Sequence, residues 1–183
     1  ELFYRFEMPL LPVLIDMECN GVKIDTNFLE TLQIEIDKRI DTLENDMEDV
    51  LGRRITATNP NDVARSVFEE LKVHEIKKQW TPKTPTGKFK TDADTLQMFK
   101  WHPFVNSLLQ VKLLNKLQST YVTAIPKKTN PETGLLHSWF NQCSTATGRL
   151  SSSGPNLQNI PARDPDAKRT REAFVSRFDG GCI

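Results

Sequence analysis

Apolar residues recur every three or four positions over most of the first 125 residues, and this spacing predicts helices. We expect a short helix over residues 9–18, ended near Gly21, where a left-handed cap would sit. A brief extended connector, Val22–Ile24, separates it from the next helix. Three residues could cap that next helix, namely Asp25, Thr26 and Asn27.

The longest amphipathic pattern runs from Phe28 to Leu51 and stops at Gly52. Its apolar residues are three and four positions apart, with acidic residues between them, which predicts one helix on the order of 36 Å long. The acidic outer face argues against contact between this helix and nucleic acid.

Shorter helices are expected further along. One begins at Asn59-Pro60, as an N-cap followed by proline in the first turn. Thr91 resembles the start of a capping box and opens a short helix through Met98. Pro103 starts another that continues to about residue 123. The lysines, prolines and glycine of residues 77–90 predict an exposed loop.

After Pro126 the helical period is lost, and Gly, Ser, Thr and Asn become frequent. We expect strands over 135–143 and 173–175, with an irregular polar segment over 156–160 between them. A turn at 179–181 would lead into a further strand at 182–183. The pattern therefore predicts a helical lobe followed by a small β portion.

Charge is distributed unevenly along the 183 residues, although the formal sum is zero. Residues 1–75 carry 8 Lys and Arg against 17 Asp and Glu, a net of −9, and residues 76–183 carry 16 against 7, a net of +9. The second half could therefore face a polyanion. Alternatively, both halves are solvated surfaces that attract each other. With 38% hydrophobic residues and no apolar run long enough for a bilayer, we expect a cytoplasmic protein without a membrane partner.

Catalytic constellations are not evident from the sequence. The 3 histidines are scattered, and the 3 cysteines lack the paired spacing of a zinc site or a disulfide framework. Buried or incidental thiols and structural histidines explain them better. The sequence by itself therefore predicts a binding lobe with neither a catalytic nor a metal site.

The densest polar run is 144–153, followed by 155–161. Hydroxyls, amides and a single arginine lie here on backbone that we expect to be irregular. Such side chains suit hydrogen bonding to phosphates, sugars and groove edges. The alternative is a Ser/Asn-rich loop whose side chains satisfy one another.

At these residues the sequence resembles a known family. Asn141–Arg163, NQCSTATGRLSSSGPNLQNIPAR, is similar to the TATGRLSSSxPNLQNIP stretch of family A DNA polymerases of the bacterial polymerase I type. Lys116–Tyr121 resembles the KLxSTY of that family's thumb domain, and residues 7–25 resemble the helix and turn that precede it. The likeness covers nearly the whole chain, in the family's order.

The resemblance implies a mainly α (α+β) fold. A long antiparallel helix pair with small tip helices would form a thumb that closes over the minor groove of a primer-template duplex, and a few β-strands would belong to an incomplete palm. Three segments follow from it: 1–21 as a helix at the palm/thumb base, 22–127 as the thumb, and 128–183 as N-terminal palm strands truncated before the catalytic motif.

The resemblance also implies a DNA-binding set. Arg149 matches the arginine that reaches the minor groove at the primer terminus, where its guanidinium can meet the acceptors that all correct base pairs present. The other matched positions are Asn156, Gln158 and Asn159 along the duplex, Lys116, Ser119 and Thr120 on the phosphate backbone, Thr58, Asn59 and Asn61 at the thumb tip, and Arg163. Several positions depart from the family's pattern, namely Thr56, Thr58, Gln118, Gly154 and Ala167.

The family's metal-binding aspartates lie beyond Gly181 and are missing here. Two-metal nucleotidyl transfer needs two carboxylates, so we expect the chain alone to be inactive, with Mg²⁺ serving the whole polymerase. Its partners would be the primer-template duplex and the remaining palm and fingers. A chain without an initiator Met that ends in a strand would be a cloned or proteolytic piece, or half of a split polymerase. The alternative is a non-enzymatic helical protein-interaction module that docks a partner through its acidic face.

Overall fold

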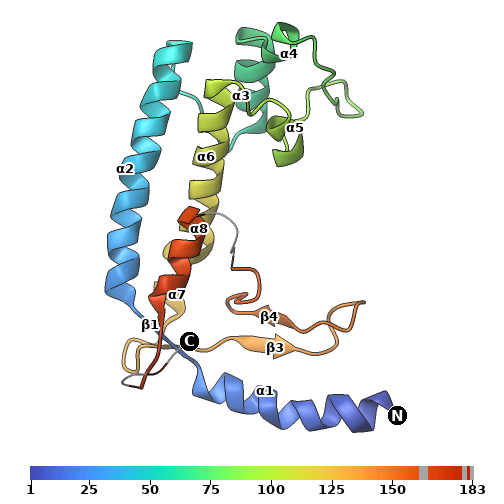
Figure 1. The fold of residues 1–183 in the computed structure, drawn as a ribbon, viewed down its shortest axis with the longest axis vertical. Helices are drawn as coiled ribbons and strands as arrows, with labels where there is room; N and C mark the ends of the chain where they lie inside the picture. Colours follow the sequence, from blue (N-terminus) through green and yellow to red (C-terminus); the bar gives the residue numbers. More distant parts are fainter. Residues whose placement is uncertain (161–164, 179–180, 182–183) are drawn as a thin grey trace. The chain divides into compact units, whose positions relative to one another are not determined.

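The computed structural model describes residues 1–160, 165–178 and 181. Helices dominate and the strands are few and short (Figure 1), so the expected mainly α (α+β) fold is confirmed. The chain divides into two compact units. Unit 1 combines Glu1–Ile34 with Leu117–Ile183, and unit 2 is Glu35–Lys116. The division into 1–21, 22–127 and 128–183 stays a prediction.

Unit 1 begins with a helix that is longer than expected. A π-helical turn, η1 (Phe3–Glu7), continues into α1 (Met8–Asn20). Gly21 ends it as predicted, with a φ of 62° and its N–H donating to Met17 O at 3.1 Å. A side chain here would also collide with the ring of His137, so both the backbone and the available space require glycine.

The predicted connector after Gly21 is the central strand of a three-stranded sheet. Strand β1 (Val22–Ile24) pairs antiparallel with β2 (Leu135–Leu136) on one side and β5 (Phe174–Val175) on the other. Asp25 then caps the next helix, because its Oδ1 accepts from Phe28 N at 2.9 Å.

The second sheet corrects two expectations. A single strand over 135–143 is wrong, because β2 ends at Leu136 and β3 (Trp139–Asn141) belongs to another sheet. Its partner is β4 (Ser151–Ser153), within the polar run that we expected to be irregular. Ser138, between β2 and β3, turns inward to bind carbonyl groups, which interrupts the strand.

Unit 2 contains the predicted antiparallel helix pair. The part of α2 (Thr26–Leu51) that belongs to this unit lies beside α6 (Pro103–Leu117), and Arg39 donates to Gln110 across the pair at 3.1 Å (Figure 1). Apolar positions of both helices are buried, as their spacing predicts. They include Ile36, Ile40, Met47, Val105, Leu108, Val111 and Leu114.

Small helices complete unit 2. They are α3 (Pro60–Ala64), η2 (Arg65–Glu70), α4 (Val73–Ile76) and α5 (Ala93–Gln97). Asn59 caps α3 as predicted. The cap of α5 is Asp92 rather than Thr91, because Asp92 Oδ1 accepts from Thr95 N at 2.8 Å. This hydrogen bond lowers the pKa of Asp92.

Arg53 ties the end of α2 to these small helices. Its guanidinium donates to Asp62 Oδ1 at 2.9 Å, to Ser66 Oγ at 2.8 Å and to Glu70 Oε2 at 3.0 Å. Asp62 also accepts from the backbone N–H of Thr56, which with Arg53 lowers the pKa of this carboxyl group.

The remaining helices of unit 1 are η3 (Gln118–Val122), α7 (Ala124–Lys128), α8 (Pro165–Arg169) and η4 (Thr170–Ala173). The helical conformation thus extends slightly beyond Pro126. Arg163, most of the turn expected at 179–181 and the strand expected at 182–183 lie outside the described residues. Over the described part of the chain, every helix is too short or too polar to cross a bilayer.

Candidate nucleic-acid interface

The predicted polar run forms a continuous ribbon in unit 1, which we define as residues 139–160. It comprises β3, a loop over 142–150, β4 and a turn over 154–159. Four of the predicted contact residues are exposed on it, namely Arg149, Asn156, Gln158 and Asn159. The β3–β4 pairing brings Trp139 opposite Ser153 and Asn141 opposite Ser151, which fixes the register of the ribbon.

Ser152 organises the turn from inside. Its hydroxyl is 5% exposed and accepts hydrogen bonds from Leu157 N at 3.0 Å and Gln158 N at 3.3 Å. It also donates to Asn156 Oδ1 at 3.1 Å. One buried hydroxyl therefore serves two backbone donors and a side-chain acceptor at the same time.

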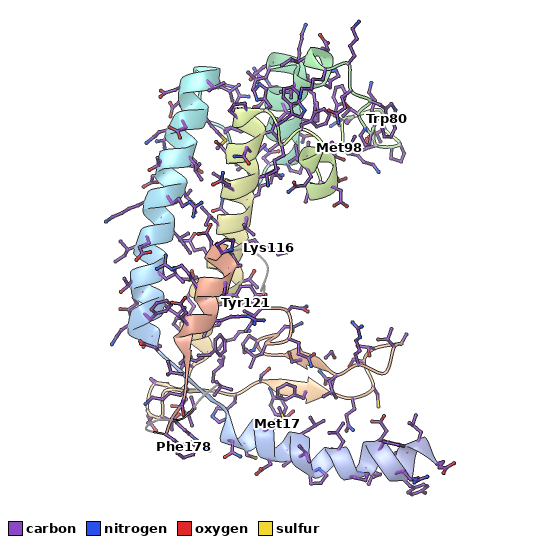
Figure 2. All side chains as sticks on the ribbon, viewed as in Figure 1. Met17, Trp80, Met98, Lys116, Tyr121 and Phe178 are labelled. Atoms are coloured by element: carbon purple, nitrogen blue, oxygen red, sulfur yellow. The ribbon has the colours of Figure 1, made fainter. Side chains whose placement is uncertain are left out.

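Two further hydroxyls fasten the turn to the rest of unit 1. Ser138 Oγ lies 3.0 Å from Ser153 O and 2.6 Å from Pro155 O. Tyr121 of η3 donates to Asn159 O at 2.5 Å. Tyr121, labelled in Figure 2, is largely buried, and burial raises the pKa of its hydroxyl.

Carboxylates of the N-terminal helix hold the other edge of the ribbon. Glu18 Oε1 accepts from Phe140 N at 2.6 Å. Gln142 Nε2 lies 3.0 Å from both the backbone oxygen and a carboxylate oxygen of Glu7. Both acids thus accept hydrogen bonds from backbone and amide donors of the ribbon.

Arg149 is the exposed cation of the ribbon. It follows Gly148, whose φ of 69° favours glycine, and its carbonyl accepts from Thr145 Oγ1. Among the described residues, no carboxylate forms an ion pair with its guanidinium. The five N–H groups of this side chain are thus presented outward, as recognition of an external acceptor requires.

The side chain of Asn156 has a structural part in the turn, and its contact with a ligand stays a prediction. Its side-chain oxygen accepts from Ser152 Oγ and from Gln158 N, both at 3.1 Å, so this oxygen shapes the turn. The idea of a self-satisfying polar loop is therefore correct for this one acceptor. Asn156 is nevertheless exposed, as are Gln158 and Asn159, so its side-chain NH₂ group remains able to meet a ligand.

The three residues predicted to contact the phosphate backbone lie on consecutive helical segments of the chain. Lys116, labelled in Figure 2, is exposed at the end of α6, and Ser119 and Thr120 are exposed on η3. Within unit 1, the hydrogen bond from Tyr121 to Asn159 joins η3 to the turn of the ribbon. The structure therefore brings Ser119 and Thr120 into the same neighbourhood as the ribbon's amides.

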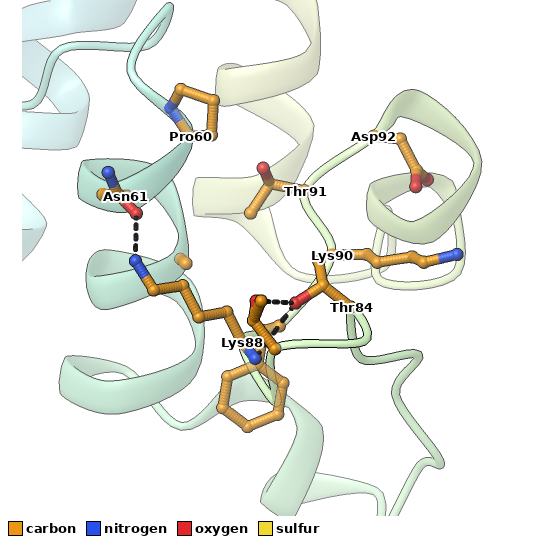
Figure 3. A pocket seen from close by; sticks show the side chains of 10 residues that line it. Pro60, Asn61, Thr84, Lys88, Lys90, Thr91 and Asp92 are labelled. Carbon is orange, nitrogen blue, oxygen red and sulfur yellow. Dashed lines mark hydrogen bonds between the residues drawn. The ribbon is translucent and has the colours of Figure 1, made fainter.

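The tip residues form a separate cluster in unit 2. Thr58, Asn59 and Asn61 are exposed, but Asn59 Oδ1 is used to cap α3 through Asn61 N at 3.0 Å. Asn61 borders a hollow of about 370 Å³, where its Oδ1 accepts from Lys88 Nζ at 3.2 Å (Figure 3).

Two lysines that line this hollow were not among the residues predicted for the site. Lys88 and Lys90 line it together with a hydrogen-bonded pair of hydroxyls from Thr84 and Thr86, 2.8 Å apart (Figure 3). The lysine-rich composition of 77–90 was the signal that could have found them. Sequence alone could not show that this loop returns to Asn61.

Metal-binding groups are absent from the described residues, where no cluster of three or more His, Cys, Asp or Glu side chains could hold an ion. These residues therefore do not fit a two-metal centre, and no catalytic step is assigned to them.

Unit 1 thus presents an exposed, internally braced polar ribbon, and unit 2 contains an antiparallel helix pair. The family model for DNA polymerase family A matches residues 26–183, and the chain belongs to this family. The sequence resemblance to family A is thus confirmed.

Among its relatives, the thermostable DNA polymerase I of Thermus thermophilus is 42% identical over 176 residues, which are 96% of this chain and 21% of that protein. DNA polymerase I of Synechocystis is 37% identical over 98% of this chain and 18% of its own length. The chain thus spans about a fifth of the length of these relatives.

A solved structure agrees with these sequence matches. The POL domain of Pol1 from M. smegmatis, in complex with DNA primer-template and dNTP, is similar with a TM-score of 0.81 and 37% identity. The match covers 93% of this chain and 29% of that one.

Proposed function

We propose that this chain is the part of a family A DNA polymerase that grips primer-template duplex. The ribbon would lie along the minor groove near the primer terminus, with Arg149, Gln158 and Asn159 meeting base and sugar acceptors. Lys116, Ser119 and Thr120 would contact the phosphate backbone, as would Thr58, Asn59 and Asn61 at the tip of unit 2. Arg163 belongs to the same proposal through its place in the sequence motif.

One observation carries this proposal. The ribbon is braced from inside by buried hydroxyls, while its arginine and the three predicted amide residues are exposed. Among the described residues, the arginine forms no ion pair. Such preorganisation lowers the entropic cost of binding, since the contacting groups are already ordered. The DNA in the similar M. smegmatis complex supports the same kind of ligand.

An affinity measurement on residues 1–183 tests this function. Binding to a labelled primer-template duplex, followed by fluorescence anisotropy at several salt concentrations, should give a Kd that rises steeply with salt. Arg149→Ala should weaken binding by about tenfold, with little change in the salt slope, because its contact is to the groove. Lys116→Ala should lower the slope by about one, because it removes a phosphate contact.

A matched control removes the same charge elsewhere. Arg5→Ala deletes an arginine that pairs with Glu1 at 2.8 Å on η1, and it should leave duplex affinity nearly unchanged. Equal losses for Arg149→Ala and Arg5→Ala would reduce the effect to net charge and refute the ribbon site.

Catalysis, in this proposal, belongs to the whole polymerase with Mg²⁺ and its remaining palm and fingers. Residues 1–183 alone should give no primer extension with Mg²⁺ and nucleotides, because two-metal transfer requires a pair of carboxylates that hold the ions. Extension by a purified preparation that survives removal of trace polymerase would overturn this.

The acidic outer face of α2 supports a second candidate, a non-enzymatic module that docks a protein. Exposed acids such as Glu35, Asp37 and Asp41 follow one another along this helix. This candidate predicts no affinity for duplex DNA at low salt, where the proposed function predicts its strongest binding.

A further inference from the structure

A basic segment of unit 2 carries an aromatic ring that the proposed duplex site does not use. Residues 76–91 contain five lysines and not one acidic residue. Trp80, in the middle of this segment, is 75% exposed and is labelled in Figure 2. A tryptophan this exposed is uncommon, because burying its ring is strongly favourable.

Hydrogen bonds of Gln79 and the burial of Thr81 hold the segment on the two sides of Trp80. Gln79 N donates to His74 O at 2.8 Å, and Gln79 Nε2 donates to Met98 O at 3.2 Å. Thr81, directly after Trp80, is buried. The backbone at Trp80 is therefore anchored on each side, so the exposed ring is carried by an ordered support.

The rest of the segment folds back on itself. Lys83 and Phe89 form an isolated antiparallel bridge, and Lys90 N donates to Pro82 O at 3.0 Å. Phe89 in turn stacks on buried Phe68, with ring centroids 4.7 Å apart. This return of the chain fixes Lys83 and Lys90 to the same support as Trp80.

Lysines and aromatic rings are interleaved on this surface. Lys77 Nζ lies 4.1 Å from the centroid of Trp101, and Lys83 Nζ lies 4.8 Å from that of Phe89. For Trp80 the structure records neither a cation nor a ring partner among the described residues. Its indole face is thus available while neighbouring rings are already covered by cations.

We propose that Trp80 and the lysines of residues 76–91 form a stacking site for an unpaired base of single-stranded nucleic acid. A base can stack on the indole only when it is not already stacked inside a duplex, and the lysines can meet the phosphates on either side of it. A duplex would engage the lysines alone and leave the indole without a function. Charge favours this partner over a protein, because the segment lacks any acid that would oppose phosphates.

This site goes beyond the proposed grip on duplex DNA, since it uses other residues and selects a different form of nucleic acid. The proposal is tested by titrating residues 1–183 with oligo(dT) of about 12 nucleotides while the tryptophan fluorescence is measured. A base that stacks on an indole quenches the emission of that indole. We expect saturable quenching and an affinity that falls as salt rises.

Substitutions at residue 80 separate stacking from charge. Trp80→Ala should weaken oligo(dT) binding by about 5- to 150-fold, the range expected for one stacked base, and Trp80→Phe should restore much of it. Ile76→Ala is the matched control, because this neighbour is also exposed, at 59%, but cannot stack. Since residue 80 is exposed, thermal melting should be unchanged in all three variants.

An abasic oligonucleotide of equal length supplies the decisive comparison. It has the same charge without bases, so wild type should bind it about as weakly as Trp80→Ala binds oligo(dT). The proposal would be overturned if the wild type bound oligo(dT) and the abasic strand equally well. It would also be overturned if the wild type and Trp80→Ala bound oligo(dT) equally well, because attraction by the lysines would then be sufficient. Arg149→Ala should keep the quenching while losing duplex affinity, so failure of one site is distinguishable from failure of the other.

Discussion

The core of unit 2 and the ribbon of unit 1 are stabilised by different kinds of interaction. In unit 2, apolar side chains such as Val63, Phe68, Phe99 and Leu108 are almost completely buried. In the ribbon, the interior contacts are made by single hydroxyl groups, chiefly those of Ser138 and Ser152. An apolar core depends on volume and tolerates exchange, whereas a hydrogen-bonded turn depends on individual atoms. The binding surface should therefore be lost by changes too small to unfold the protein.

The largest expected effect tests the apolar side of this comparison. Ile36→Ala removes a side chain that is 4% exposed and should lower the free energy of unfolding by about 2–5 kcal/mol, through lost burial and a residual cavity. Ile34→Ala, two positions away on the same helix and 57% exposed, is its control and should cost less than about 1 kcal/mol. Urea denaturation followed by circular dichroism measures both, and equal losses would contradict the assigned face of α2.

The second prediction concerns a single oxygen atom of the ribbon. Ser152→Ala removes the acceptor of Leu157 N and one of the two hydrogen bonds made by Gln158 N and by Asn156 Oδ1, at a cost of about 1–3 kcal/mol. Hydrogen exchange at the two amides should accelerate, and duplex affinity should fall while the helical signal is retained. Ser153→Ala, at an exposed neighbour, should do neither. Unchanged exchange in Ser152→Ala would show that this hydroxyl does not hold the turn.

A pH series tests the charged contact between Arg53 and Asp62 in unit 2. The pKa of Asp62 is lowered by the N–H of Thr56 and by Arg53, so its stabilising contribution is complete above the usual aspartate pKa of about 3.9 and is lost as pH falls through the lower, folded value. Asp62→Asn should cost roughly 1–2 kcal/mol near neutral pH and flatten the acid decline of stability. Thermal denaturation of the wild type and of Asp62→Asn between about pH 7 and pH 3 tests this. If the stability of both proteins fell in parallel with pH, Asp62 would not make this contribution.

The smallest expected effect lies at a helix end. Gly52 has a φ of 69° and nothing within 4 Å of the position where a Cβ would stand, so Gly52→Ala should cost only about 1 kcal/mol of backbone strain. Gly21→Ala adds a collision with His137 to a similar φ and should cost more. Thermal denaturation can rank the two, and the reverse order would mean that strain, not space, dominates at both glycines.

The sequence predicted most of unit 2 because helices with one buried face have a regular apolar period. The helices that contain Leu32 and Leu108 follow it closely, and caps such as Asn59 are local signals. The break between β2 and β3 was not predictable, because it depends on Ser138 reaching a carbonyl group 17 residues away. The part that the Asn156 oxygen plays in the turn was not predictable either, and the ligand contact that the resemblance implies for this residue stays a prediction.

The fastening of the ribbon's turn has a consequence for the conditions in which it keeps its shape. Ser138, Ser152 and Tyr121 carry no charge near neutral pH, so added electrolyte should leave these three links intact even as it releases a polyanion. Because burial raises the pKa of the Tyr121 hydroxyl, this donor also keeps its proton into more alkaline solution than a free tyrosine would. The turn should therefore keep its conformation through exposure to high salt or mild alkali, and it should not need to refold before it binds a ligand again.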